Sequence, residues 1–251
     1  MKNVVMAAML TLLVIGCKEK QKETSTEKAE EVVSEQKMPS AEGEWTMIFD
    51  GKSFNGWHEY LKDGVSENWK IEDGAMVFYP PKERKDGEQF NLVSDTEYTD
   101  FVLSLDWRIS DAGNSGVMWG VKESPDLSQP YLTGPEIQVL DNDKHPDGKN
   151  GTSHQAGALY DMVPPSKDVT KPVGEWNTMV FTVNHKTNEG NVVLNGVEIV
   201  KFSVNDPEWG EMVSKSKFAD WEHFAKYTTG KFALQDHGNE VAFKNIKVKE
   251  L

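Results

Sequence analysis

The chain has 251 residues, of which 27 are Lys or Arg and 41 are Asp or Glu, so its formal net charge is −14. This acidic balance argues against a nucleic-acid partner, because such a partner requires a basic surface to meet its phosphates. A single cysteine excludes an internal disulfide and a cysteine-rich metal cluster.

Residues 1–16 have the pattern of a lipoprotein signal peptide. Lys2 gives the positive start, and the apolar stretch over residues 4–15 is too short to span a bilayer as a permanent helix. Val14-Ile15-Gly16 before Cys17 resembles a bacterial lipobox, in which the cysteine is lipidated and becomes the new N-terminus. The alternative is a plain secretory signal with an incidental cysteine. We expect a location in the bacterial cell envelope, facing the periplasm or the cell surface, with membrane attachment through the lipid alone.

Residues 17–43 carry the lipidated cysteine and a predicted disordered tether. After Cys17 this segment is rich in Lys, Glu, Ser, Thr and Gln and has no aromatic residue, so it cannot bury enough apolar surface to offset its ordering entropy. As a flexible coil of roughly 25 residues it would reach on the order of 25–30 Å. The remaining residues, 44–251, suit one domain.

Within that domain the aromatic and β-branched runs are short, alternate with polar residues and are separated by Gly, Asn and Asp, as in strands. The longest run places five apolar residues on one face: Phe101, Leu103, Leu105, Trp107 and Ile109. Asp73-Gly74 and Asn195-Gly196 each lie between two strand-like runs and predict tight hairpins. The pattern predicts an all-β fold, a jelly-roll sandwich of two antiparallel sheets.

Two strands in the middle of the domain carry polar residues of particular interest. Over residues 134–141, period-two alternation directs Glu136 and Gln138 to one side and Ile137 and Val139 to the other. A second strand, over residues 116–121, follows a turn-like stretch that contains Asn114, and its glycines allow a ligand or a backbone to come close. The alternative is two ordinary sandwich strands with a polar outer face.

The aromatic residues divide into core and site candidates. Trp57 and Trp176 are expected in the core as large apolar anchors. Tyr160 and Trp119 are better placed to stack on the ring of a ligand, although Trp119 shares the face of Val117 and Val121, which favours the core. Residues 207–227 have a helical spacing of aromatic residues and are expected to form a helix that packs on one rim.

Seven short motifs occur in a fixed order: Ile48–Trp57, Gly113–Gly116, Glu136–Asp141, Gly157–Tyr160, Gly174–Thr178, Leu234–Gly238 and Phe243–Ile246. Together they resemble the 3-keto-disaccharide hydrolase family, over essentially all of residues 45–251. The resemblance implies a concanavalin A-like jelly roll and a small carbohydrate substrate that is oxidised at C3. It also implies a secreted or lipid-anchored bacterial protein.

A ketone at C3 makes the C2 proton acidic, because the carbanion is delocalised as an enolate. Removal of that proton expels the leaving group from C1, and water then adds back. Such a site requires a base near C2, an electrophile at the C3 oxygen and polar groups for the hydroxyls. A divalent metal is one candidate for the electrophile, and Glu136 and Asp141 would be its ligands.

The candidate catalytic residues are Glu136, His154 and His237, with Glu136 as the first choice for the base. The candidate substrate-binding residues are Asn114, Gln138, Arg108 and Tyr160. His154 and His237 lie in predicted loops, which often carry function on rigid sandwiches. The alternative for each candidate is structural: a surface position on a strand or an ordinary turn residue.

Two other functions remain open. A conventional glycosidase requires two carboxylates roughly 5–9.5 Å apart. Asp141 faces away from Glu136 at roughly 17 Å along the strand, so a pair on this strand is excluded, whereas a pair from different strands is not. A non-catalytic carbohydrate-binding module shares the fold and would not require a Glu and a His to converge.

Overall fold

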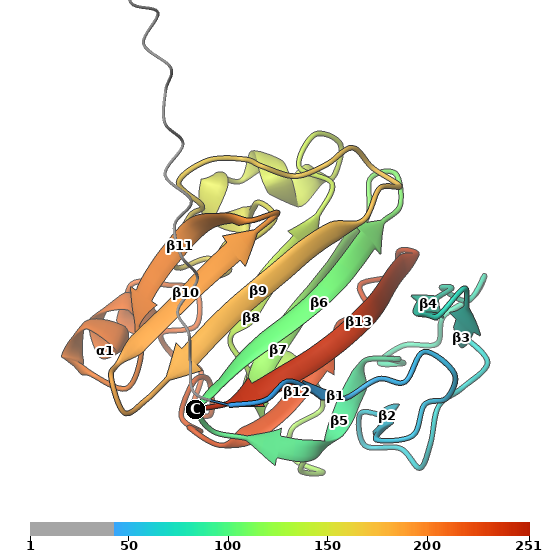
Figure 1. Cartoon of the computed structure of the whole chain (residues 1–251), viewed down its shortest axis with the longest axis horizontal. Helices are drawn as coiled ribbons and strands as arrows, with labels where there is room; N and C mark the ends of the chain where they lie inside the picture. The colour runs from blue at the N-terminus through green and yellow to red at the C-terminus, as the bar shows by residue number, and fades with distance from the viewer. Residues whose placement is uncertain (1–42) are drawn as a thin grey trace, which may run out of the picture. The chain divides into compact units, whose positions relative to one another are not determined.

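Two antiparallel β-sheets packed face to face form the computed structural model of the protein, which describes residues 43–251 (Figure 1). In strand order the larger sheet contains β11 (Val197–Ser203), β10 (Glu189–Leu194), β9 (Asn177–Asn184), β6 (Phe101–Ile109), β13 (Val241–Glu250), β4 (Ala75–Phe78) and β3 (Trp69–Glu72). The short strand β1 (Thr46–Met47) also pairs with β13. The smaller sheet contains β2 (Trp57–Glu59), β5 (Leu92–Tyr98), β12 (Gly230–Leu234), β7 (Asn114–Val121) and β8 (Glu136–Leu140). This architecture confirms the predicted two-sheet sandwich.

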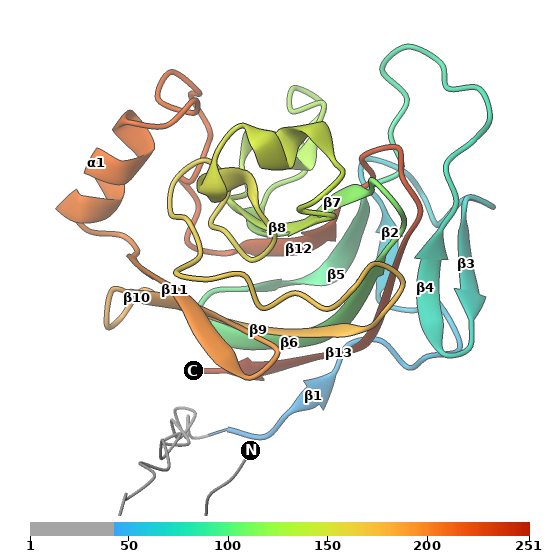
Figure 2. The ribbon, with the colours of Figure 1, turned by 90° about the horizontal axis from the view of Figure 1, so that it is seen from above.

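The core lies between the two sheets and follows the predicted alternation. All five apolar residues of β6 are buried, and Ile137 and Val139 of β8 face them from the other sheet. Glu136 and Gln138 therefore point out of the sandwich, yet both are also buried. Figure 2 shows the reason, because the segments between β7 and β9 lie over the outer face of the smaller sheet.

Both predicted hairpins are present. Asp73-Gly74 joins β3 to β4, and Asn195-Gly196 joins β10 to β11. All four residues have positive φ, with values of 51° and 75° in the first turn and 51° and 81° in the second. Two successive left-handed residues are the requirement of a type I′ turn, which matches the right-handed twist of the strands.

The predicted helix over residues 207–227 is wrong in its length, because α1 covers only Pro207–Ser214. Asp206 caps its first turn by accepting a hydrogen bond from the Trp209 backbone N–H. Beyond the helix, the Ser216 hydroxyl donates to the Val213 carbonyl and accepts from the Phe218 backbone N–H, which replaces helical pairing with local bonds. Trp209 stays in α1, whereas Phe218, Trp221 and Phe224 cluster in the turns that follow.

Of the tryptophans assigned to the core from the sequence, Trp176 is not buried there. Trp57 is in the core as expected, and so is Trp119, which packs against Phe181 and Phe202. Trp176 is only half-buried and lies on the outer face of the larger sheet, where the cations of Arg108 and Lys244 are 4.9 and 4.0 Å from its ring. The residue after it, Asn177, occupies the inward position at the start of β9.

The predictions for residues 1–42, including the signal peptide, Cys17 and nearly all of the tether, lie outside the described residues. Among residues 43–251, no helix has both the length and the apolar composition of a membrane span.

Leu105 tests the assignment of strand faces, because it is 1% exposed in the middle of β6. We expect Leu105→Ala to lower the free energy of unfolding by about 2–5 kcal/mol, through lost apolar burial and the cavity left behind. Urea denaturation measures this change. The exposed Val173→Ala is the control, with an expected effect within about 0.5 kcal/mol. If Leu105→Ala is no more costly than the control, the faces are reversed.

Candidate active site

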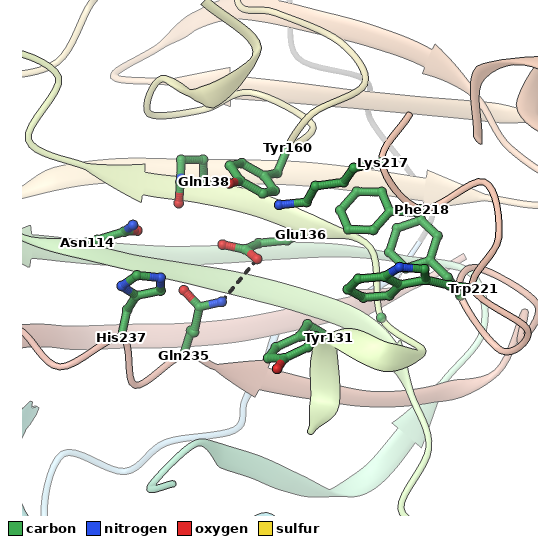
Figure 3. Close-up of a pocket in the computed structure, with 12 residues that line it drawn as sticks. Asn114, Tyr131, Glu136, Gln138, Tyr160, Lys217, Phe218, Trp221, Gln235 and His237 are labelled. Atoms are coloured by element: carbon green, nitrogen blue, oxygen red, sulfur yellow. Dashed lines mark hydrogen bonds between the residues drawn. The ribbon is translucent and has the colours of Figure 1, made fainter. Parts of the chain in front are cut away.

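A pocket of about 360 Å³ opens on the outer face of the smaller sheet (Figure 3). Its floor comes from β7, β8 and the end of β12, and its walls come from the covering loops. The lining residues are Asn114, Tyr131, Gly134, Glu136, Gln138, Tyr160, Lys217, Phe218, Trp221, Phe224, Gln235 and His237. The pocket therefore gathers segments that are more than 100 residues apart in the chain.

Glu136 lies on the floor at the centre of this pocket and is 8% exposed. Its carboxyl group lies across Gly116 of the neighbouring strand, where a Cβ atom would be 2.0 Å from Oε1. Any side chain at Gly116 would therefore displace the carboxyl group. The glycine predicted to allow a close approach does so, and the group that approaches is the carboxyl of Glu136.

Burial raises the pKa of Glu136 from 4.5 to about 8. The positive charge of Lys217 and a hydrogen bond from Gln235 oppose this shift, and the negative charge of Asp147 adds to it. The Gln235 bond runs from Nε2 to Oε2 over 3.1 Å. Glu136 is therefore poised between its protonated and ionised forms near neutral pH, which is where an acid–base catalyst works best.

Three amide side chains surround the carboxyl group. Asn114 Oδ1 and Gln235 Oε1 are buried and find no hydrogen-bond partner in residues 43–251. The orientation of Gln235 is fixed because its Nε2 already donates to Glu136. Gln138 Oε1 accepts from the Val139 backbone N–H, which leaves its Nε2 as a donor for the pocket. Buried acceptors without partners are rare in folded proteins, so these two oxygens indicate a ligand with hydroxyl donors.

His237 lies at the rim of the polar end and keeps access to solvent. Its pKa is lowered from 6.5, mainly by desolvation from the surrounding protein and then by His145, whose ring is 6.0 Å away. The negative charges of Asp147 and Asp236 oppose this shift without cancelling it. Asp236 is itself engaged by Arg84 and by the Phe90 backbone N–H. At neutral pH His237 is therefore mainly a neutral imidazole, which can accept a proton.

The opposite end of the pocket is aromatic. Phe218 stacks on Phe224 at 3.9 Å and meets Trp221 edge-on at 5.1 Å. Tyr131, from the 3-10 helix at Pro130–Leu132, lies 5.9 Å from Trp221 and is 37% exposed. In Figure 3 Glu136 lies between these rings and the polar end with Asn114 and His237. The pocket can therefore hold a ligand with a hydroxyl-rich part and a flat apolar part.

Comparison with known proteins agrees with this geometry. Residues 44–249 match the family model of the 3-keto-alpha-glucoside-1,2-lyase-like domain. A 3-keto-disaccharide hydrolase of Bacteroides thetaiotaomicron is 37% identical, with 89% of this chain and 84% of that protein covered. The chain belongs to the 3-keto-disaccharide hydrolase family. It is an enzyme that cleaves glycosidic bonds.

Solved structures share the fold. A candidate glycosyl hydrolase of Parabacteroides distasonis is 32% identical and superimposes with a TM-score of 0.75, with 84% of this chain and 94% of that chain covered. A second one from the same organism is 24% identical, covers 83% of this chain and 100% of its own, and has a TM-score of 0.61. A galectin-like protein of Bacillus subtilis, at 10% identity and a TM-score of 0.50 over 82% of this chain and 94% of that one, shares the jelly-roll fold alone.

The structure brings five of the predicted site residues of this family member into one pocket: Glu136, His237, Asn114, Gln138 and Tyr160. His154 is outside the pocket lining and packs behind Tyr160, with ring centroids 4.7 Å apart. Its Nδ1 lies 2.9 Å from Asp147 Oδ1 and its Nε2 lies 3.1 Å from Asp161 Oδ1. The structure therefore places His154 behind the wall of this pocket and outside its lining.

Arg108 and Asp141 are also outside the pocket. Arg108 lies on the outer face of the larger sheet against Trp176, whereas the pocket lies on the smaller sheet. Asp141 Oδ2 accepts from the Ala112 backbone N–H, and Oδ1 accepts from two N–H groups of the following turn. Asp141 thus has the turn role that the sequence left open. In residues 43–251, no group of three or more His, Cys, Asp or Glu side chains has a metal-binding arrangement.

Four residues of the pocket lining were not predicted as site residues from the sequence: Lys217, Gln235, Tyr131 and Trp221. Gln235 comes directly after β12, within the motif Leu234–Gly238. Knowledge of where this strand ends would have predicted it as a site residue. Lys217 had no such signal, because its segment was expected to be a helix on the rim. Its ammonium group lies 4.1 Å from the Tyr160 ring centroid and lowers the pKa of Glu136.

The raised pKa of Glu136 predicts a pH-dependent cost in stability. Between pH 4.5 and 8 the folded state keeps a proton that the unfolded state releases, so wild-type stability falls with rising pH by roughly 1.4 kcal/mol per unit. Glu136→Gln should remove this dependence, and its stability relative to wild type should rise from pH 5 to pH 8. Urea denaturation across this range tests the prediction, with the exposed Glu67→Gln as control. A difference that does not change with pH contradicts it.

Proposed function

We propose that the protein cleaves 3-keto-glycosides by an elimination that begins with removal of the C2 proton. The observation that carries this proposal is the buried Glu136 carboxyl group, whose pKa of about 8 makes its ionised form a stronger base than an ordinary carboxylate. The family match and the 3-keto-disaccharide hydrolase from Bacteroides thetaiotaomicron support the choice of substrate class.

In the proposed reaction, ionised Glu136 takes the C2 proton and the electron pair moves onto the C3 oxygen as an enolate. The Lys217 ammonium and the Gln138 amide are the donors that the pocket offers to this oxygen. Collapse of the enolate breaks the bond from C1 to the leaving oxygen, which takes a proton from water. The hydroxide that this leaves then adds to C1 while Glu136 returns the proton to C2, and the sum is hydrolysis.

The two ends of the pocket suggest how the substrate lies. The unpartnered oxygens of Asn114 and Gln235 accept hydroxyl protons of the oxidised ring at the polar end. The leaving group then extends over Tyr131 and Trp221, whose rings offer a flat apolar surface for a second sugar or another aglycone. Glu136, between the two ends, is next to the bond that breaks.

A conventional glycosidase mechanism receives less support, because it requires two carboxyl groups facing the substrate. Of the described residues that line the pocket, Glu136 is the only one with a carboxyl group. Asp147 lies behind the wall, where it accepts hydrogen bonds from Tyr160 and Asn150 and pairs with His154. A binding module also receives less support, since recognition of neutral sugars does not require a carboxyl group with a raised pKa.

We expect Glu136→Gln to reduce kcat on a 3-keto-glucoside by about 10²–10⁴-fold, because the variant keeps its shape and lacks the base. In wild type, kcat/KM should rise with pH up to about 8, as the ionised fraction of Glu136 grows. Deuterium at C2 should slow turnover or exchange with solvent during it. These measurements use purified protein and steady-state assays.

The controls for this experiment are Glu67→Gln, which changes an exposed carboxyl group, and the unoxidised glycoside. Equal cleavage of the unoxidised glycoside refutes the 3-keto substrate. A rate that falls as pH rises through 8 shows that Glu136 acts as an acid instead of a base. Full activity of Glu136→Gln places the base at His237.

We also propose that Cys17 carries the lipid anchor and holds the protein in the cell envelope, on the basis of Val14-Ile15-Gly16-Cys17. Labelled fatty acid should enter the wild-type protein in cells, and Cys17→Ser should remain unlabelled and be released from the membrane fraction. Equal labelling of the two proteins excludes lipidation at this residue.

A further inference from the structure

Behind the pocket wall, a chain of hydrogen bonds joins the loop of Tyr160 to the loop of Lys217. The Tyr160 hydroxyl donates to Asp147 Oδ2 over 2.9 Å, and Asp147 Oδ1 lies 2.9 Å from His154 Nδ1. On the other side of the ring, His154 Nε2 lies 3.1 Å from Asp161 Oδ1. Asp161 Oδ2 in turn accepts from the Lys217 backbone N–H over 2.7 Å.

The centre of this chain is an imidazole between two carboxylates. Burial favours the protonated form of Asp147, but hydrogen bonds from Asn150, Tyr160 and His154 hold its pKa below 3.8. A neutral imidazole has one N–H and one lone pair, so it would present a lone pair to one of the two carboxylate oxygens. The ring is held from both sides, with Asp147 at Nδ1 and Asp161 at Nε2.

Other groups around the ring fit the same role. The Tyr160 ring meets the imidazole edge-on. The Lys217 ammonium lies over the same tyrosine ring, 4.1 Å from its centroid. Neither His154 nor Asp161 lines the pocket, whereas Tyr160 and Lys217 both do. His154 and Asp161 therefore act on the reaction through Tyr160 and Lys217, the two residues that the chain holds in the wall.

We propose that His154 is a positioning residue: it fixes Asp161, and so clamps the Tyr160 and Lys217 loops together and holds the Lys217 ammonium beside Glu136. The inference rests on the proposed function, in which Lys217 stabilises the ionised Glu136 and the enolate. Loss of the imidazole leaves Asp161 without its ring partner and loosens the carboxylate that accepts from the Lys217 N–H.

The test follows the Glu136 carboxyl group itself, by NMR titration of protein labelled with ¹³C at glutamate Cδ. Loss of one signal in Glu136→Gln assigns it. His154→Gln should raise the midpoint of this titration by about one pH unit, because the cation moves away. Lys217→Met should raise it similarly, and the double variant should raise it no further. A His154→Gln midpoint equal to that of wild type overturns the proposal, and so does additivity of the two changes.

Asp161→Gly is a second variant in case His154→Gln does not fold. It removes the carboxylate that contacts His154 Nε2 and accepts from the Lys217 N–H. Asp161 has a φ of 61°, which Gly adopts without strain. The Glu136 midpoint should rise in this variant, as in Lys217→Met. A midpoint equal to that of wild type overturns the clamp.

The two proposals fail in different ways. If wild-type protein does not cleave a 3-keto-glucoside, the proposed function is wrong, and the Glu136 titration in the variants still decides whether His154 positions Lys217. If cleavage occurs and the titration midpoint does not respond to His154→Gln, the function stands and the clamp is wrong.

Discussion

The buried carboxyl group of Glu136 is the constraint on which the site depends. A strand on the outer face of a sandwich normally gives its polar side chains to water, where a carboxylate ionises freely. Here loops cover that face, so ionisation of Glu136 becomes unfavourable and its pKa rises to about 8. The Lys217 charge and the Gln235 amide limit the shift, because without them the pKa of Glu136 would be higher still.

Several features of the surrounding structure affect the negative charge of ionised Glu136. The loop of Lys217 must reach over the sheet from the end of α1, and its turns are held by serine hydroxyls and by Asp161. Asp147 brings a second negative charge near the pocket, but Tyr160 and His154 lie between it and the ligand space. Glu136 is thus the carboxyl group that lines the pocket, while Asp147 and Asp161 accept the hydrogen bonds that hold the wall in place.

The sequence predicted the sandwich because strand faces are a local property. Period-two alternation specified which side of β6 and β8 meets the core, and Asp-Gly and Asn-Gly pairs specified two turns. The same alternation could not show what covers the other side of each strand. Arg108 and Glu136 therefore looked equivalent, although one faces solvent on the larger sheet and the other is enclosed on the smaller one. Lys217 could not be predicted as a site residue, because the three- and four-residue spacing of the aromatic residues around it fits a helix as well as the turns that the structure has.

Gly116 has a consequence for stereochemistry. Because it has no side chain, the Glu136 carboxyl group lies flat on the sheet, and a sugar ring in the pocket meets this base from one face only. In the proposed reaction the hydrogen at C2 must point toward the floor when it leaves, and it returns from the floor when water adds. The configuration at C2 would then be the same before and after cleavage, and an epimer with that hydrogen on the opposite face would bind without reacting.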